Sequence, residues 1–382
     1  MKTFDVGIIG GGPAGSVTAL SLARRGYAVA LIDKQIFPRE KLCGDFVNPI
    51  NWPIFHELGV AGQILAQEHT AVTQFRITSC SGAAAEASFA AGNGQESFGL
   101  GLRRRYLDYV LLTAAAGHGV AVMQGCRVQK LKRDAQGWCL DVGQSAGFES
   151  IRTKILIGAD GRNSWVAEHL GMANGAGVQG QSVGFQFYLK SRAARGGTIE
   201  IHLFPGGYAG LVGLGDGTLN LGFAVEQARL PREHPVEFLR NNCLSRNPYL
   251  SDILNHSDQV GAVRSTYPVY FSPRKSYGDG VLLVGDAARV SEPVTGEGMY
   301  CAMKSGLLAA QTIHQAFGQG DWTAAGLRDY ELQCRRIFRP RRRINALIRW
   351  LVYRPALLSP LIRFSARRGR LLDSLVRAVC LP

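Results

Sequence analysis

The chain has 382 residues, 46% of them apolar and 19% charged, with a formal net charge of +14. This length allows about two to three domains with cores that need no disulfide or metal. The composition excludes an intrinsically disordered chain, and no uncharged apolar run reaches the ~18 residues of a membrane span. We expect no signal peptide, because the N-terminus leads straight into a strand. Eight cysteines without a CxxC pair favour reduced thiols in a cytoplasmic protein.

A strand–helix–strand unit is predicted in residues 4–33. Residues 4–9 are a β-branched, apolar run typical of a buried parallel strand, and a helical pattern follows as far as Gly26. Residues 27–32 form a second such strand, which Asp33 ends. A carboxylate about 20 residues after the first turn is placed to accept hydrogen bonds from a ribose.

The turn after the first strand carries the GxGxxG pattern of a dinucleotide site. Gly10 permits a tight turn, Gly12 lets a pyrophosphate approach the backbone, and Gly15 lets the helix pack on the strand. Pro13 and Ala14 open the helix, whose free N–H groups and positive dipole end face the phosphates. The complete unit predicts dinucleotide binding, but it does not choose between nicotinamide and flavin.

Three later segments make that choice, and with the first turn they carry a family resemblance. They are a basic helix start at 103–108 that ends in Leu-Asp, a strand and Asp-Gly turn at 155–164, and a strand and Gly-Asp turn at 280–288 that leads to a helix start at 293–299. In this order they resemble the FAD-dependent aromatic hydroxylases and geranylgeranyl reductases, over roughly residues 1–330.

The resemblance implies an α/β fold: a glutathione-reductase-type Rossmann domain with an inserted antiparallel sheet for the substrate and a C-terminal helical tail. Asp286 would bind the ribityl chain, and the helix after Gly296 and Gly298 would direct its positive end at the flavin. The implied FAD contacts are Gly10, Gly12, Pro13, Ala14, Gly15, Asp33, Arg103, Asp160, Gly285, Asp286, Gly296, Gly298 and Met299.

The resemblance also predicts the domain organisation. The FAD-binding domain takes residues 1–71, 100–175 and 266–330, and the substrate domain takes strands in 72–99 and a β-sheet in 176–265. Alternating patterns at 183–188, 199–204, 208–212 and 219–223 predict hairpins of this sheet. Basic amphipathic helices, interrupted at three prolines (Pro340, Pro355 and Pro360), are expected in 331–382.

Several residues depart from the family pattern. The Asp-Gly turn lacks the Arg that usually follows it, since Ala167 stands there, and Asp33 replaces the commoner Glu. Of the Tyr-x-Trp-x-Phe-Pro stretch of the reductases, only Tyr208 is kept, and Gly210 replaces the Trp. These departures count against a plain isoprenoid reductase and leave more room above the flavin. The halogenase stretch is absent as well.

We expect the flavin to carry the chemistry, so no side chain is assigned as certainly catalytic. The candidates near it are Cys43, Tyr208 and Pro293. Cys43 lies in a Cys-Gly pair like that of the reductases and is equally compatible with an inert, packed thiol. The sequence predicts no metal site. Without a second dinucleotide fold, electrons would come from transiently bound NAD(P)H or from a reductase partner.

The charge is concentrated in the tail. Residues 335–382 hold thirteen Arg, no Lys and one acid, Asp373, a net charge of +12. Three interpretations stay open: a surface for an anionic membrane, a docking face for an acidic carrier protein, or a cover for the FAD domain. A nucleic acid is not expected, because the chain has no recognition module. The protein would then be cytoplasmic, with peripheral membrane attachment in the first interpretation.

The sequence therefore predicts an FAD-dependent oxidoreductase acting on a hydrophobic aromatic, polyketide or isoprenoid-like molecule. The favoured reaction is hydroxylation with O2 through a flavin C4a-hydroperoxide. The alternatives are reduction or dehydrogenation of a carbon–carbon double bond and, outside enzymology, an FAD-containing scaffold.

Overall fold

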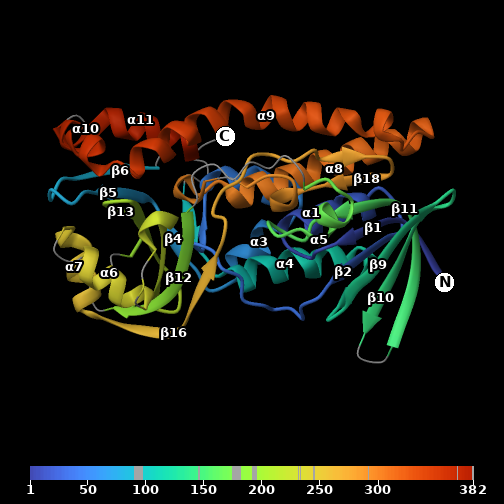
Figure 1. Ribbon diagram of the computed structural model, residues 1–382, viewed down its shortest axis with the longest axis horizontal. Helices are drawn as coiled ribbons and strands as arrows, with labels where there is room; N and C mark the ends of the chain where they lie inside the picture. Colours follow the sequence, from blue (N-terminus) through green and yellow to red (C-terminus); the bar gives the residue numbers. More distant parts are fainter. Residues whose placement is uncertain are drawn as a thin grey trace.

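The structure is a computed structural model that describes residues 1–89, 98–144, 147–173, 182–191, 196–230, 232, 234–243, 246–290, 292–367 and 369–380. Parts of the two predicted substrate-domain segments, residues 90–97, 176–181 and 192–195, lie outside these ranges. Figure 1 shows two units side by side, each built on its own sheet, under a layer of C-terminal helices.

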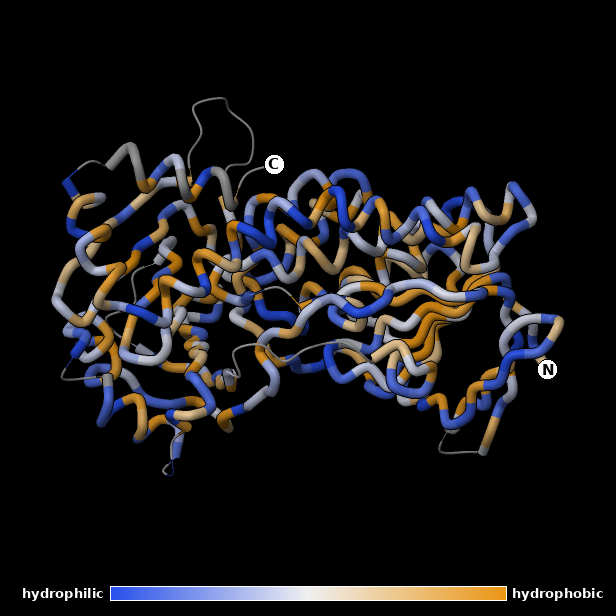
Figure 2. The backbone as a smooth tube through the Cα atoms, turned by 45° about the horizontal axis from the view of Figure 1, so that its top comes forward, coloured by the Kyte–Doolittle hydropathy of each residue, from blue (hydrophilic) through white to orange (hydrophobic). Residues whose placement is uncertain are grey.

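The first unit is a sheet of eight strands whose centre is parallel. Its order is β17-β18-β11-β1-β2-β8, and a hairpin of β9 and β10 extends from β11. The central strands are mostly apolar because helices cover one face and the β9–β10 hairpin with a short helix covers the other, and they appear as the orange stack near the N-terminus in Figure 2. The strands are β1 (Lys2–Ile9), β2 (Val29–Asp33), β8 (Ala121–Gln124), β9 (Arg127–Asp134), β10 (Gly137–Gln144), β11 (Gly147–Gly158), β17 (Tyr277–Gly278) and β18 (Val281–Leu283).

The helices of this unit form its largest apolar core. Helices α1, α4, α8 and α9 contribute to one continuous buried cluster with the inner side chains of β1, β2, β11 and β18. The helices are α1 (Pro13–Ala23), α2 (Trp52–Glu57), α3 (Ala61–Leu65), α4 (Arg104–Gly117), α5 (Trp165–His169) and α8 (Gly298–Gln319), and a small sheet of β3 (Phe46–Val47), β4 (Thr70–Val72) and β7 (Gly99–Gly101) lies beside them.

The second unit is a sheet of seven strands in the order β16-β12-β15-β14-β13-β5-β6, antiparallel except between β13 and β5. It confirms the four predicted strands and the hairpins formed by β13, β14 and β15, whereas β12 pairs with β15 and β16 instead of with the strand that follows it. The α6–α7 face of the sheet buries an apolar cluster of its own. The elements are β5 (Gln74–Thr78), β6 (Ala84–Ser88), β12 (Ser182–Ser191), β13 (Thr198–Phe204), β14 (Gly207–Gly213), β15 (Thr218–Glu226), β16 (Ser257–Thr266), α6 (Pro235–Cys243) and α7 (Pro248–Asn255).

The tail forms three helices, α9 (Ala324–Val352), α10 (Pro355–Arg367) and α11 (Gly369–Cys380). The prediction that Pro340 and Pro360 interrupt the helices was wrong, because α9 and α10 run through them, whereas Pro355 does begin a helix. An internal proline costs a helix about 3 kcal/mol. Burial of Tyr330, Cys334 and Phe338 on the inner face of α9 offsets that cost.

The predicted α/β fold with an inserted sheet and a helical tail is therefore confirmed. Among the described residues, no helix combines the length and the hydrophobicity that crossing a bilayer requires.

Candidate functional site: a cofactor cleft

The turn after β1 has the backbone that the glycine pattern predicts. Gly10 has a φ of +112°, and a Cβ there would lie 2.3 Å from the carbonyl oxygen of Ala159. A Cβ on Gly15 would lie 1.9 Å from the carbonyl oxygen of Gly10. Only glycine fits at these two positions, and the fit brings the start of α1 directly behind the strand end. Pro13 and Ala14 are buried in this first turn of the helix.

Gly12 differs from its neighbours because it faces open space. A Cβ built on Gly12 would have a single neighbour within 4 Å, Nη2 of Arg39 at 3.6 Å. The space between this backbone and a guanidinium, at the N-terminus of a helix, is suited to a phosphate group. The chain therefore has room for the pyrophosphate of FAD at the predicted place, and Arg39, which sequence reasoning missed, lies beside that space.

Asp33 and Asp160 hold the loops on either side of this turn. The Asp33 carboxylate accepts hydrogen bonds from the backbone N–H groups of Gly11, at 2.7 Å, and Gln35, at 2.8 Å. Asp160 accepts hydrogen bonds from the Ser164 hydroxyl, at 2.6 Å, and from the backbone of its own loop. Burial raises the pKa of Asp160. Both residues lie at the cleft, and their contacts with FAD stay predictions.

Asp286 reaches the same cleft from the end of β18. Its carboxylate is partly exposed and lies 3.6 Å from Nη2 of Arg162. Gly285 before it has a φ of +57°, and a Cβ there would lie 2.8 Å from Ala14 Cβ, so the Gly-Asp turn packs against the start of α1. Asp286 therefore lies close to the start of α1, on which the predicted pyrophosphate turn also opens.

Several cations face this path. Burial lowers the pKa of Lys41, and the nearby positive charges of Arg104, Arg39 and Arg162 lower it further. Arg104 binds the buried carboxylate of Asp108 with two hydrogen bonds of 2.8 and 2.9 Å. Asp108 also pairs with Arg39, at 3.1 Å, and Asp286 pairs with Arg162. These four cations outnumber the two carboxylates, and the excess positive charge suits a polyanionic ligand. The signal for Arg39 and Lys41 was their position just ahead of the Cys-Gly pair.

Arg103 lies elsewhere. Its guanidinium binds Asp216, with Nε at 2.9 Å, and stacks 4.1 Å from the ring centre of Tyr188 in the substrate sheet. The structure thus places Arg103 between the two units, and its contact with FAD stays a prediction. Arg104, the next residue, binds Asp108 of the FAD unit instead.

The far end of the cleft is formed by the loop before α8. Gly296 has a φ of +65°, and a Cβ there would lie 2.9 Å from the ring of Phe46, whereas Gly298 faces open space. Pro293 is exposed and Met299 is buried. Open backbone beside an aromatic ring, at the N-terminus of a 22-residue helix, fits the flat and electron-rich flavin.

Two buried carboxylates that sequence reasoning missed fix this loop at both ends. Glu297 is 1% exposed, forms an ion pair with Arg341 of α9 and accepts a hydrogen bond of 2.8 Å from Nδ2 of Asn345. Glu292 is 2% exposed, and its Oε1 accepts a hydrogen bond of 2.8 Å from the Tyr208 hydroxyl of β14. The only sequence signal was an acid on each side of the Pro-Val-Thr-Gly stretch.

Burial shifts the proton equilibria of the Glu292 pair. It raises the pKa of Glu292 to about 7, although Tyr208 and the positive charge of Arg349 oppose the shift. It also raises the pKa of Tyr208, as does the neighbouring carboxylate. A carboxyl group with a pKa near 7 exchanges its proton readily at neutral pH, which suits a general acid.

Cys43 lies in the loop that crosses to the substrate sheet. Burial raises the pKa of its thiol, which keeps it protonated and favours the inert role. Asn220 of β15 donates hydrogen bonds to the Cys43 carbonyl oxygen, at 2.8 Å, and to Asp45 Oδ2, at 2.6 Å. Asp45 is fully buried and also accepts a hydrogen bond of 3.0 Å from the Tyr188 hydroxyl. Asp45 is thus the residue that ties this loop to the substrate sheet.

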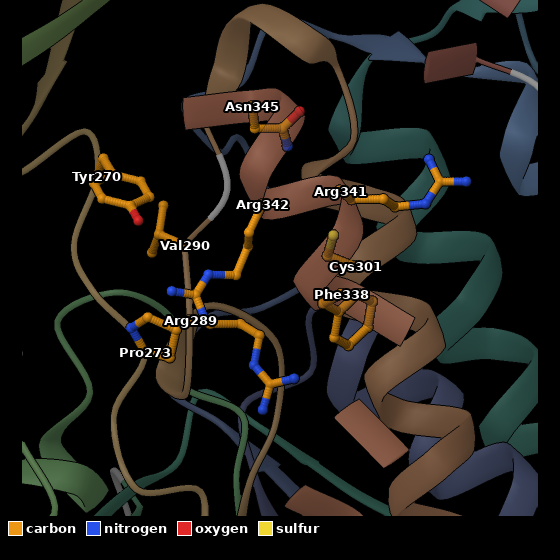
Figure 3. Close-up of a pocket in the computed structure, with 9 residues that line it drawn as sticks. All are labelled: Tyr270, Pro273, Arg289, Val290, Cys301, Phe338, Arg341, Arg342 and Asn345. Carbon is orange, nitrogen blue, oxygen red and sulfur yellow. The ribbon is translucent and has the colours of Figure 1, made fainter. Parts of the chain in front are cut away.

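A separate small pocket lies between α9 and the FAD unit. Figure 3 shows Arg341 reaching away from Arg289 and Arg342 there. Its nine lining residues include none of the predicted site residues, and we regard it as a packing gap behind α8. Within the described ranges, no three His, Cys, Asp or Glu side chains come together as a metal site requires.

Two curated proteins illustrate the sequence relatives of this chain. "Conditioned medium factor receptor 1" of Dictyostelium discoideum is 26% identical over 86% of this chain and 66% of its own length. Digeranylgeranylglycerophospholipid reductase 1 of Methanococcoides burtonii is 28% identical over 88% of this chain and 80% of its own length.

Solved structures share the fold. A flavoprotein/dehydrogenase from Cytophaga hutchinsonii superposes with a TM-score of 0.81 at 20% identity, over 99% of this chain and 95% of its own. The myxobacterial chondrochloren halogenase gives a TM-score of 0.79 at 22% identity, over 88% and 80%. A family model described as "FAD binding domain" matches residues 3–340. The chain therefore belongs to the FAD binding domain family and is a flavoprotein of the FAD-dependent oxidoreductase class.

Proposed function

We propose that the protein is an FAD-dependent reductase that adds two hydrogens across a carbon–carbon double bond of a hydrophobic, isoprenoid-like substrate. The observation that carries the proposal is the buried Glu292–Tyr208 pair, which joins the flavin-facing loop to the substrate sheet. Digeranylgeranylglycerophospholipid reductases among the relatives, at 27–29% identity over most of both chains, support the same reaction class.

The reaction needs a hydride and a proton. The hydride for one carbon of the double bond would come from FAD, once FAD is bound in the site and reduced by NAD(P)H or by a reductase partner. The second carbon must take a proton, and Glu292 holds one at a pKa of about 7. Tyr208 would pass that proton on through its hydroxyl. Both side chains are nearly inaccessible to water, so a substrate that reached Tyr208 would have little solvent to compete with for the proton.

The surroundings of the pair are apolar, as such a substrate requires. Tyr208 belongs to a buried cluster with Ile201, Leu203 and Val269. This cluster lies on the face of the substrate sheet opposite α6 and α7. Side chains alternate along β14, so Gly210 lies on that same face. This apolar layer favours a hydrocarbon chain over a polar metabolite.

Hydroxylation, which the sequence analysis favoured, is the second candidate. The observation that supports it is the room at Gly210, where a Cβ would have Ile201 Cδ1 at 3.5 Å as its nearest neighbour. A substrate bulkier than a single isoprenoid chain could use that room. The same proton donor would serve either reaction, so product analysis has to separate them.

The test is product mass after a single turnover of dithionite-reduced enzyme with a geranylgeranyl lipid, with and without O2. The proposal expects a gain of two hydrogens per turnover that does not need O2. A gain of one oxygen that appears only in air would replace it with hydroxylation. Tightly bound FAD without turnover of this lipid or of aromatic probes would favour the scaffold.

A further inference from the structure

Helices α9 and α10 are the outermost layer of the molecule (Figure 1). The inner sides of both helices pack against the rest of the protein, since Phe338 and Val352 of α9 and Ile362 of α10 are buried. The layer therefore has a fixed inner face and a fixed outer face. This arrangement supports the interpretation of the tail as a cover, but it leaves the outer face to be explained.

The outer face is apolar where α9 ends and α10 begins. Of the fifteen large apolar side chains that are exposed among the described residues, most are scattered over the chain. Five lie within residues 344–361, each 44–58% exposed: Ile344, Leu347, Trp350, Leu357 and Leu361. Spacings of three and four residues place them on the side of each helix away from the core. A concentration of this kind indicates an interaction surface.

The same face is strongly basic. Arg336, Arg339 and Arg343 are exposed and precede Leu347 along the outer side of α9. The single acid of residues 335–382, Asp373, is turned inward, since its carboxylate accepts a hydrogen bond of 3.1 Å from the backbone of Ser88. Within the described part of residues 335–382, no acid therefore offsets these arginines at the outer face.

We propose that this outer face of α9 and α10 docks the protein on an anionic bilayer. Apolar side chains of this size enter the headgroup region, while long arginine side chains reach the lipid phosphates. A bilayer accepts both kinds of side chain over an extended surface, whereas an acidic carrier protein would engage the arginines and leave most of the apolar side chains in water.

The docking face adjoins the proposed substrate layer. Tyr353, at the end of α9, packs edge-to-face on Tyr208 with ring centres 5.9 Å apart. Val352 and Ile362 belong to the same buried cluster as Tyr208. A lipid substrate could pass from the bilayer to the sheet at this corner. That last step rests on the proposed function, but the docking does not.

The experiment is co-sedimentation of the full-length holoprotein with vesicles of phosphatidylcholine, with or without phosphatidylglycerol. We expect binding to the anionic vesicles that weakens, without vanishing, as salt rises to ~0.5 M. Each arginine near such a surface contributes about 1 kcal/mol, so Arg336→Gln/Arg339→Gln/Arg343→Gln should weaken binding by roughly tenfold to a hundredfold. Leu347→Ser/Trp350→Ser/Leu361→Ser should remove the binding that survives high salt.

The matched control is Lys130→Gln/Lys132→Gln/Arg240→Gln, which removes the same charge from exposed positions elsewhere. It should bind within about twofold of the wild type. Binding that is equal for neutral and anionic vesicles, absent from both, or equally weak in control and tail variants would overturn the proposal. So would capture by an acidic carrier protein without vesicle binding. FAD content and product mass, measured on the same variants, report separately on the proposed function.

Discussion

The two ends of the cofactor cleft are built in different ways. The end predicted for the adenosine half of FAD is fixed by backbone geometry, mostly within residues 1–33, where glycines allow contacts that a side chain would block. The flavin end is assembled from distant segments that meet through buried carboxylates: Asp45, Glu292 and Glu297. The first end depends on small residues, whereas the second depends on side-chain partners contributed by the substrate sheet and the tail.

The largest expected effects are at the glycine end. A side chain on Gly15 would overlap the Gly10 carbonyl oxygen, so Gly15→Val should give no soluble folded protein. Gly12→Val has room in the fold but would occupy the space for the pyrophosphate, so it should give folded, colourless protein. Circular dichroism and visible absorbance of the two variants check this contrast. Normal flavin content in folded Gly12→Val would remove this turn from the site.

At the flavin end, the tail should be essential to stability. Removing one partner of a buried ion pair typically costs about 3–5 kcal/mol, so Arg341→Ala should lower the free energy of unfolding by roughly 3 kcal/mol. Arg343→Ala, an exposed neighbour, should stay within about 0.5 kcal/mol of the wild type. Urea unfolding measures both values. Equal values for the two variants would mean that α9 does not hold the loop before α8.

Asp286 lies where the two ends meet. Hydrogen bonds to a charged group are worth about 1.5–3 kcal/mol, so Asp286→Ala should weaken FAD tenfold or more. Asp258→Ala, an exposed carboxylate on the substrate sheet, is the control. Fluorescence titration of the apoprotein gives the affinities. An unchanged affinity for Asp286→Ala would exclude the residue from the site.

The buried Glu292 should make stability depend on pH. Its pKa is about 7 in the folded chain and 4.5 when unfolded, so the folded chain holds the extra proton between these values. The contribution of Glu292 to the free energy of unfolding is therefore fully present below about pH 4.5. It falls by up to about 1.4 kcal/mol per pH unit as the pH rises to 7. In Glu292→Gln this part of the fall in Tm should disappear. Glu57→Gln, which changes an exposed carboxylate, is the control and should keep the wild-type profile. A wild-type Tm that falls no more steeply than that of Glu292→Gln would contradict the prediction.

The smallest effect should distinguish two arginines. Arg39 lies beside Gly12, whereas Arg103 is bound by Asp216. We expect Arg39→Ala to weaken FAD several-fold and Arg103→Ala to change its affinity by less than about twofold. The same titration checks both. The reverse order would restore Arg103 to the contacts that the family resemblance implies.

This difference also explains how much could be predicted from sequence. Gly10, Gly15 and Asp33 act over a short stretch, so their spacing alone predicts the turn that the structure shows. Asp45, Glu292 and Glu297 act through partners far away in the chain, and no local pattern connects Glu297 with Arg341 and Asn345. The helix through Pro340 was missed for the same reason, since burial of the inner face of α9 outweighs the local preference of proline.

The most direct test of two separately built ends compares ADP with FAD as ligands of the apoprotein. ADP would occupy only the glycine end, which is predicted for the adenosine half of FAD. Gly12→Val should lose both ligands. Asn345→Ala, a milder change than Arg341→Ala at the Glu297 contact, should keep its ADP affinity within about twofold and bind FAD several-fold more weakly. Equal losses of ADP and FAD in Asn345→Ala, in a variant that remains folded, would contradict a cleft with two independently built ends.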